Sequence, residues 1–147
     1  MKIAASDIGI AELLFAGSPA AQKGESVFFE ECIKELNEYF NNKRTTFSVP
    51  LALQGTDFQK KVWNELLKIP FGETISYMQL AINLGDKKSI RAAGTANGRN
   101  PVAIIVPCHR VIGSSGDLVG YGGGLDKKKW LLEHEGVLTQ QELFSAK

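Results

Sequence analysis

The stretch Val102-Ala103-Ile104-Ile105-Val106-Pro107-Cys108-His109-Arg110-Val111 joins an unbroken apolar run to three reactive side chains. The apolar run 102–106 predicts a buried strand or extended segment. Pro107 fixes its own backbone torsion and cannot donate a hydrogen bond to a strand partner, so we expect it to stiffen the chain before the thiol. The sequence therefore predicts that Cys108 stands at the end of buried structure.

Cys108 needs a base to act as a nucleophile, because a thiol with a pKa of about 8.5 is mostly protonated at neutral pH. His109 follows it directly, but neighbouring side chains on an extended segment point to opposite faces. A bridging water or a local turn would have to connect the two. Glu133 and Glu135 are candidates for the group that orients the imidazole. The alternative interpretation is a structural thiol beside a surface histidine.

The second cysteine, Cys32, falls on the apolar stripe of an amphipathic helix predicted over residues 27–40. We expect it to be a small buried hydrophobic residue without reactivity. The chain has two Cys and two His, without C-x-x-C or H-x-x-x-H spacing. We therefore expect no disulfide framework, no metal and no cofactor.

The segments around the quoted stretch contain signals for several short elements. A strand is predicted over residues 8–15, a short extended segment over 47–51, and a helix over 126–134. Thr56 to Gln59 and Ser76 to Gln79 have capping-box spacing, and begin helices expected to reach Pro70 and about Asn83. A further helix over 87–97 would complete a helix-turn-helix. The alternative is ordinary tight packing of helices that carry small side chains.

Length and composition limit the class of protein. The 147 residues, 44% of them hydrophobic, suffice for one ordinary domain or two small ones. No stretch approaches the roughly 18 apolar residues of a membrane span, so we expect a soluble intracellular protein without a membrane partner.

The net charge of +1 is unevenly distributed along the chain. Residues 1–53 hold five Lys/Arg against seven Asp/Glu, whereas residues 54–147 hold twelve against nine. Residues 87–110 carry five cations and no acid, which suits phosphate groups as well as an ordinary solvated surface.

Residues 107–111 resemble the active-site signature of the O6-alkylguanine-DNA alkyltransferases. Further motifs of that family occur in the same order over residues 53–136. They are Gly55-Thr56-Asp57-Phe58-Gln59, Ile69-Pro70-Phe71-Gly72-Glu73-Thr74-Ile75-Ser76-Tyr77, Arg91-Ala92-Ala93-Gly94, Asn97-Gly98-Arg99-Asn100-Pro101, Gly120-Tyr121-Gly122-Gly123-Gly124-Leu125 and Trp130-Leu131-Leu132-Glu133-His134-Glu135-Gly136.

The resemblance implies an α/β (α+β) fold with a reduced N-terminal α/β subdomain over residues 1–52. A mainly helical, winged-helix-like C-terminal domain containing the helix-turn-helix would follow over residues 53–147. The implied activity is direct-reversal DNA repair: a methyl or other alkyl group moves once from O6-alkylguanine, and also from O4-alkylthymine, to the protein's own cysteine. The implied partner is double-stranded DNA, bound through its minor groove by a monomer in the cytoplasm, or in the nucleus of a eukaryote.

The resemblance also implies a role for each matching residue. Cys108 would accept the alkyl group, His109 would take the thiol proton through water, Glu135 would polarise His109, and Asn100 would hold the turn. Base-binding positions would be Tyr77, Val111, Tyr121, Gly122 and Ala103. DNA-binding positions would be Arg91, which fills the gap left by the extruded base, the bare helix surface at Ala92 and Gly94, and the cations Lys88 and Arg99. For Arg110 we expect a loop tie or a phosphate contact.

Three departures from the family pattern are visible. The leader is short, Ala103 stands where some members have proline, and Gly122 stands where some have serine. We expect a roomier or less preorganised pocket. Two other functions remain as alternatives: a non-catalytic protein that binds the lesion, whose known members lack the cysteine, and a cysteine hydrolase that uses Cys108, His109 and Glu135.

Overall fold

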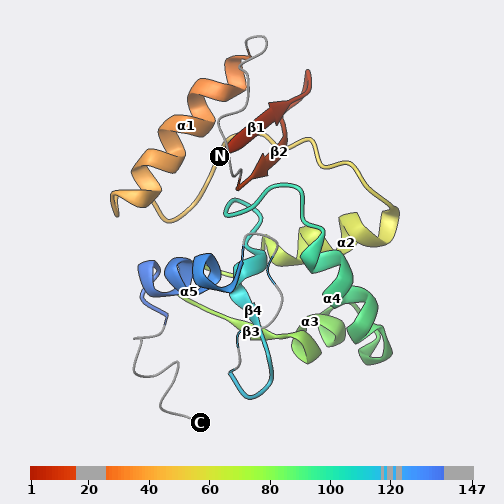
Figure 1. Cartoon of the computed structure of the whole chain (residues 1–147). Coiled ribbons are helices and arrows are strands. Elements are labelled where there is room, and N and C mark those ends of the chain that lie inside the picture. The colour runs from red at the N-terminus through yellow and green to blue at the C-terminus, as the bar shows by residue number, and fades with distance from the viewer. Residues whose placement is uncertain (16–25, 117, 119–120, 122–123, 138–147) are drawn as a thin grey trace. The chain divides into compact units, whose positions relative to one another are not determined.

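The computed structural model describes residues 1–15, 26–116, 118, 121 and 124–137. These residues form two compact units (Figure 1). Unit 1 comprises Met1–Gln54 and Pro101–Ile105, and unit 2 comprises Gly55–Asn100 and Val106 onward. Within the described part of the chain, no helix is both long and apolar enough to cross a membrane.

Unit 1 is built on a two-stranded antiparallel hairpin. Strands β1 (Lys2–Ala5) and β2 (Ile10–Leu14) pair with an irregularity after Ala4. The strand predicted over residues 8–15 is therefore present in its central part, whereas β1 was not predicted. Its Lys-Ile-Ala-Ala sequence is short and rich in alanine, which has little preference for strands.

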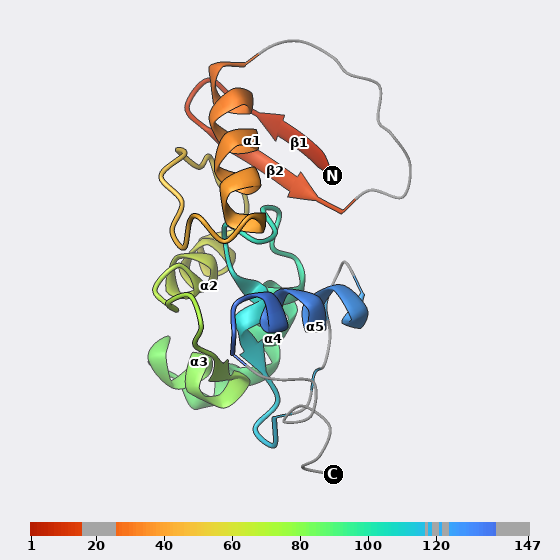
Figure 2. The same cartoon turned by 90° about the vertical axis from the view of Figure 1, so that its left-hand side faces the viewer.

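Helix α1 (Val27–Phe40) packs against the hairpin, as predicted from its apolar stripe (Figure 2). Ser26 caps it by accepting a hydrogen bond from the backbone nitrogen of Phe28. Cys32 is completely buried, and burial raises the pKa of its thiol to about 11. The expectation of a buried, unreactive Cys32 is consistent with this environment.

The apolar run 102–106 is buried, but the prediction of a strand or extended segment is wrong beyond its first residue. Val102 forms an isolated bridge with Leu13, and the backbone nitrogen of Ala103 donates to the Leu13 carbonyl at 2.8 Å. The chain then turns, with Ile104 at a φ of 70°. Full burial selects apolar residues whatever the backbone conformation, so the pattern did not reveal the turn.

Unit 2 begins with helix α2 (Asp57–Leu66), whose predicted capping box is confirmed. The backbone nitrogen of Gln59 donates to Thr56 Oγ1 at 3.1 Å, and the backbone nitrogen of Thr56 donates to Gln59 Oε1 at 2.9 Å. The helix ends at Leu66, a few residues before Pro70. Trp63 lies on the buried face of this helix and donates from Nε1 to the Ala96 carbonyl at 2.9 Å.

The remaining elements of unit 2 are short. Strand β3 (Ile75–Ser76) pairs in parallel with β4 (Val111–Ile112), and α3 (Tyr77–Asn83) follows β3 directly. The helix predicted over residues 87–97 is divided into a 3-10 turn, η1 (Lys87–Ser89), and α4 (Ile90–Gly98). A second 3-10 turn, η2 (Cys108–Arg110), carries the signature.

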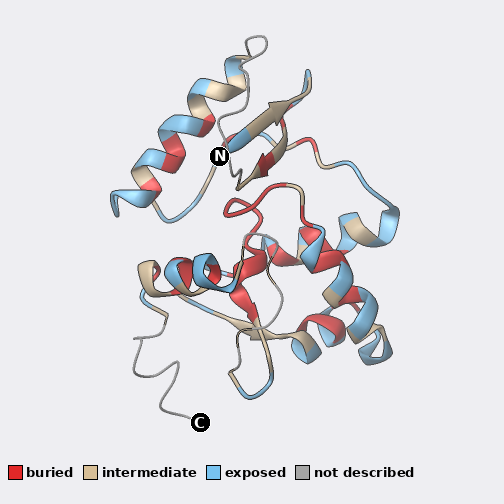
Figure 3. Cartoon of the chain, in the orientation of Figure 1, coloured by how far each residue is buried: buried red, intermediate tan, exposed pale blue. Residues whose placement is uncertain are grey.

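Helix α5 (Leu125–His134) closes the described part of unit 2. Leu131 and Leu132 are buried, but Trp130 is 50% exposed and stacks on His134 with ring centroids 4.9 Å apart. Leu131 and Leu132, rather than Trp130, therefore attach this helix to the core. Buried residues of unit 2 lie on α2, α3, α4 and α5 and on the segment around η2 (Figure 3).

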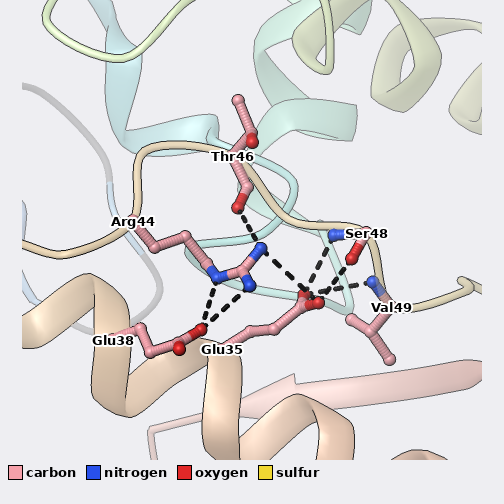
Figure 4. A network of polar contacts seen from close by, with 6 residues as sticks. All are labelled: Glu35, Glu38, Arg44, Thr46, Ser48 and Val49. Carbon is pink, nitrogen blue, oxygen red and sulfur yellow. Dashed lines mark hydrogen bonds and ion pairs between the residues drawn. The ribbon is translucent and has the colours of Figure 1, made fainter.

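A buried carboxylate ties α1 to the following loop in unit 1 (Figure 4). Glu35 is completely buried and accepts hydrogen bonds from the backbone nitrogens of Ser48 and Val49 at 2.9 and 3.1 Å, and from Ser48 Oγ at 2.6 Å. Arg44 lies 3.6 Å from the same carboxylate and 2.9 Å from Glu38. Burial acts to raise the pKa of Glu35, but the hydrogen bond from Ser48 helps to hold it below its ordinary value.

We expect Glu35→Gln to destabilise the protein by roughly 1–3 kcal/mol, because the amide NH2 would face donors rather than accept from them. Equilibrium urea unfolding measures this loss. Glu38→Gln is the matched control, since Glu38 is partly exposed and shares the same arginine. Equal stability of the two variants would contradict the assigned importance of the buried network.

Candidate active site

Cys108 lies at the start of the 3-10 turn η2 and is 6% exposed. The turn is closed by a hydrogen bond from the backbone nitrogen of Arg110 to the Pro107 carbonyl at 3.0 Å. A local turn was one of the two connections expected between Cys108 and His109, and a bridging water was the other. Both side chains are buried within unit 2.

His109 is held by Glu135, which follows the last residue of α5. The distance from His109 Nε2 to Glu135 Oε2 is 2.7 Å, and both side chains are excluded from solvent. The other ring nitrogen, Nδ1, has no hydrogen-bond partner among the described residues. The imidazole is thus fixed on one side and open to a further polar group on the other.

Arg110 binds the same carboxylate as His109. Its Nε donates to Glu135 Oε1 at 2.7 Å and its Nη2 to Oε2 at 2.9 Å, which is the two-pronged geometry that arginine favours with carboxylates. Nη1 donates to the Ile69 carbonyl at 2.6 Å. Of the two expectations for Arg110, the structure therefore shows a tie between segments.

The electrostatics of this cluster follow from burial and pairing. Burial acts to raise the pKa of Glu135, but hydrogen bonds from His109 and Arg110 hold it at about 2. Burial lowers the pKa of His109, so its imidazole is favoured in the neutral form. Burial also raises the pKa of Cys108, which leaves the thiol protonated at rest. A proton acceptor is therefore required before the sulfur can attack.

Lys128 is a buried cation that the sequence reasoning missed. It is completely buried, donates from Nζ to the Val111 carbonyl at 2.7 Å, and lies 5.7 Å from the ring centre of Tyr77. Burial lowers its pKa to about 8, and its charge acts to lower the pKa of Cys108. A signal was available, because Lys128 stands seven residues before Glu135 and shares the buried face of α5 with Leu131 and Leu132.

Asn100, which the resemblance expects to hold the turn, is buried. Its Nδ2 donates to the Val106 carbonyl at 2.7 Å, and its side chain also forms a hydrogen bond with Cys108. Asn97, which was not predicted, donates from Nδ2 to the Cys108 carbonyl at 3.4 Å. Two asparagines thus hold the backbone on either side of the thiol.

The expected base-binding residues differ in burial and do not all belong to the same unit. Val111 is buried, Tyr77 and Tyr121 are partly buried, and burial raises the pKa of both tyrosine hydroxyls. Ala103 is buried in unit 1, within the turn after Val102. Gly122 lies outside the described residues.

The expected DNA-binding residues are mostly exposed. Lys88 on η1, Arg91 and Ala92 on α4, and Arg99 at the end of α4 are all exposed. No salt bridge joins these three cations to a carboxylate within the described ranges. Gly94 is partly buried, and a side chain there would lie 3.7 Å from the Tyr77 ring.

The arrangement combines a soft nucleophile, a neutral imidazole and an ionised carboxylate that orients it. Such a set can remove the thiol proton and let sulfur attack an electrophilic carbon. Because the thiol is buried, a substrate atom has to be delivered to it.

Comparison with known proteins agrees with this chemistry. Residues 57–137 match the family described as "6-O-methylguanine DNA methyltransferase, DNA binding domain", and residues 1–53 match its "ribonuclease-like domain". A methylated-DNA–protein-cysteine methyltransferase of Methanosarcina acetivorans is 55% identical over 109 residues, which are 74% of this chain and 70% of the relative. The enzyme of that name from Mycobacterium leprae is 53% identical over 122 residues, 82% and 74% of the two chains.

A solved structure covers almost the whole chain. The crystal structure of Mycobacterium tuberculosis OGT in complex with DNA is 44% identical, with a TM-score of 0.81, over 97% of this chain and 91% of that one. With both family regions matched and the relatives covered over more than two thirds of their length, the chain belongs to the methylated-DNA–protein-cysteine methyltransferase family of enzymes.

Proposed function

We propose that this protein removes the alkyl group from O6-alkylguanine in double-stranded DNA by transferring it to Cys108, once per molecule. The observation that carries the proposal is the buried pairing of His109 with Glu135, next to the Cys108 thiol on the turn η2. O4-alkylthymine presents the same kind of alkyl carbon and is a second substrate.

The proton path starts at the thiol. A water molecule bridges Cys108 Sγ to His109 Nδ1, the ring nitrogen without a partner among the described residues. Glu135 accepts the hydrogen on Nε2, so the imidazole presents a lone pair at Nδ1 and is stabilised when it becomes charged. Arg110 keeps the carboxylate ionised, which prevents Glu135 from taking that hydrogen for itself.

The transfer is a displacement at the alkyl carbon. The thiolate forms a sulfur–carbon bond, the bond between that carbon and guanine O6 breaks, and the electron pair stays on the base. The proton that left the thiol neutralises the guanine. The resulting thioether has no good leaving group, so the site is consumed.

The DNA contact is assigned to α3 and α4. They form the helix-turn-helix of a winged-helix-like C-terminal domain, with α4 in the minor groove. The exposed face of α4 carries Ala92 beside Arg91, and the small alanine side chain lets this face enter a narrow groove. A stacked guanine cannot reach a buried thiol, so the base is extruded and Arg91 fills its place.

The support for DNA as the partner is the relative from Mycobacterium tuberculosis, whose structure was solved with DNA. The exposed cations Lys88 and Arg99 suit phosphate contacts that are independent of sequence. Such contacts let an enzyme inspect any sequence for a lesion. The protein acts as a monomer in this proposal.

We expect mass spectrometry to find one added methyl group on the Cys108 peptide after incubation with duplex DNA containing O6-methylguanine. Cys108→Ser should bind the DNA and acquire no methyl group. Cys32→Ala is the matched control and should transfer normally, because Cys32 is buried and its thiol pKa is about 11. A wild-type protein without an adduct would overturn the proposal.

We expect Glu135→Gln to slow transfer by roughly a hundredfold, because the amide cannot stabilise a charged His109 as the carboxylate does. Glu133→Gln, which changes the other acid at the end of α5, is the control and should keep the normal rate. Single-turnover quench measurements compare the two variants.

Glu135 should also make stability depend on pH. Its folded pKa of about 2 lies below the ordinary 4.5, so the stabilisation is present above pH 4.5 and is lost as pH falls toward 2. The loss is on the order of 3 kcal/mol in the wild type and should be absent in Glu135→Gln. Identical pH profiles of urea unfolding would show that the carboxylate is not held ionised.

We expect Arg91→Ala to reduce transfer from paired O6-methylguanine by at least about tenfold, because the extruded state loses the side chain that fills the gap. Transfer from the same lesion in single-stranded DNA should change little. Lys88→Ala is the control: it should weaken all DNA binding alike and reduce its salt dependence. A normal rate for Arg91→Ala on duplex DNA would refute the assignment of Arg91.

A further inference from the structure

Lys128 brings a charged group into the buried part of unit 2. Its side chain is excluded from solvent and lies on the face of α5 that also buries Leu131 and Leu132. A charged group costs more to bury than a neutral hydrogen-bond donor. Burial accordingly lowers the pKa of Lys128 from its ordinary 10.5 to about 8. A buried ammonium therefore calls for a role that a neutral side chain could not fill.

The contacts of Lys128 hold its ammonium next to the turn that carries the thiol. Nζ donates to the Val111 carbonyl at 2.7 Å, and the backbone nitrogen of Val111 donates to the Cys108 carbonyl. The ammonium also lies 5.7 Å from the centre of the Tyr77 ring, within the range of a cation–π interaction. These contacts fix the cation at the aromatic ring and at the residue that follows η2.

The charge of Lys128 acts on the Cys108 thiol. Burial raises the pKa of Cys108, and the charge of Lys128 acts in the opposite direction. Burial likewise lowers the pKa of Lys128, and a Cys108 thiolate acts to raise it. A hydrogen bond to the Val111 carbonyl would not by itself need this charge, because a neutral amide can donate one.

The same charge acts on His109, and there its effect is opposed. When the thiol ionises, its S–H bond breaks, the electron pair stays on sulfur, and the proton passes through water to the imidazole. Burial lowers the pKa of His109 and the charge of Lys128 adds to this, but the Glu135 carboxylate, 2.7 Å from Nε2, acts to raise it. The carboxylate thus favours the imidazolium, and the ammonium favours the thiolate.

We infer that Lys128 is a further residue required for rapid transfer, because its buried ammonium stabilises the Cys108 thiolate in a place shielded from solvent. The consequence for transfer rests on the proposed function, whereas the effect on the thiolate needs no DNA. The titratable groups that face Lys128 are Tyr77 on α3 and Cys108 and His109 on η2.

The first test measures the thiolate without DNA. Iodoacetamide forms a sulfur–carbon bond with a thiolate and releases iodide, and mass spectrometry follows its addition to Cys108 in a Cys32→Ala background. We expect Lys128→Met, which keeps the length of the side chain, to slow labelling at neutral pH by at least about tenfold, because less of the thiol is ionised.

Lys127→Met is the matched control, because it removes the exposed cation next to Lys128 in the sequence. It should label at the normal rate. A merely structural role of Lys128 would loosen the site and leave the labelling of Lys128→Met equal or faster, and that result would overturn the inference.

The second test is the pH dependence of methyl transfer from duplex O6-methylguanine in single-turnover reactions. The wild-type rate should fall as pH rises through about 8, because Lys128 then loses its proton and its charge. Lys127→Met should show the same decline. Lys128→Met should be slower at neutral pH and show no decline, because it has no charge to lose.

The wild-type profile alone keeps the inference falsifiable if Lys128→Met does not fold, since a rate that does not decline above pH 8 would overturn it. Normal transfer by the wild type with equal labelling of the two lysine variants would overturn the inference and leave the proposed function intact. Slower labelling of Lys128→Met, with no transfer from DNA by the wild type, would overturn the proposed function and support the effect on the thiolate.

Discussion

The carboxylate of Glu135 is the constraint on which unit 2 depends. It accepts from His109 on one oxygen and from Arg110 on both, in a place that solvent does not reach. A buried charge of this kind is tolerated only when its partners are complete, and removing one partner leaves the others uncompensated. Through the bond from Arg110 to Ile69, the same carboxylate also links the end of α5 to the segment after α2. A cluster of leucines could give equal stability, but it could not orient an imidazole.

Helix α5 and the residue after it therefore place one buried cation and one buried anion near η2. Lys128 near its start and Glu135 just after its end lie two turns apart on the buried face. The Lys128 ammonium donates to the carbonyl of Val111, just after the turn η2, and the Glu135 carboxylate binds His109 within that turn, so α5 and its C-cap contact η2 at two places. A shift of α5 along its axis would disturb both contacts together. The exposed stack of Trp130 on His134 shows that aromatic packing does not set this position.

Sequence patterns predicted the elements whose signals are local. The capping box at Thr56, the stripe of α1 and the burial of Cys32 depend on residues within a few positions of one another, and the structure shows all three. The resemblance also named His109 and Glu135, which the structure brings to 2.7 Å. The turn after Val102, the partner of Arg110 and the burial of Lys128 depend on contacts distant in sequence. A run of apolar residues has the same sequence pattern whether its backbone is extended or turns back. A run of lysines likewise does not show which of its side chains is buried.

Unit 1 includes the short segment 101–105, which lies in the sequence between two parts of unit 2. Its backbone bonds with Leu13 belong to unit 1, although unit 2 supplies the chain on both of its sides. A division of the gene near codon 54 would therefore not separate two self-sufficient products. The downstream product would keep Val102, Ala103 and Ile104 as apolar surface without their strand, immediately before the nucleophile. A chimaera with a relative should therefore exchange the first fifty residues together with this pentapeptide.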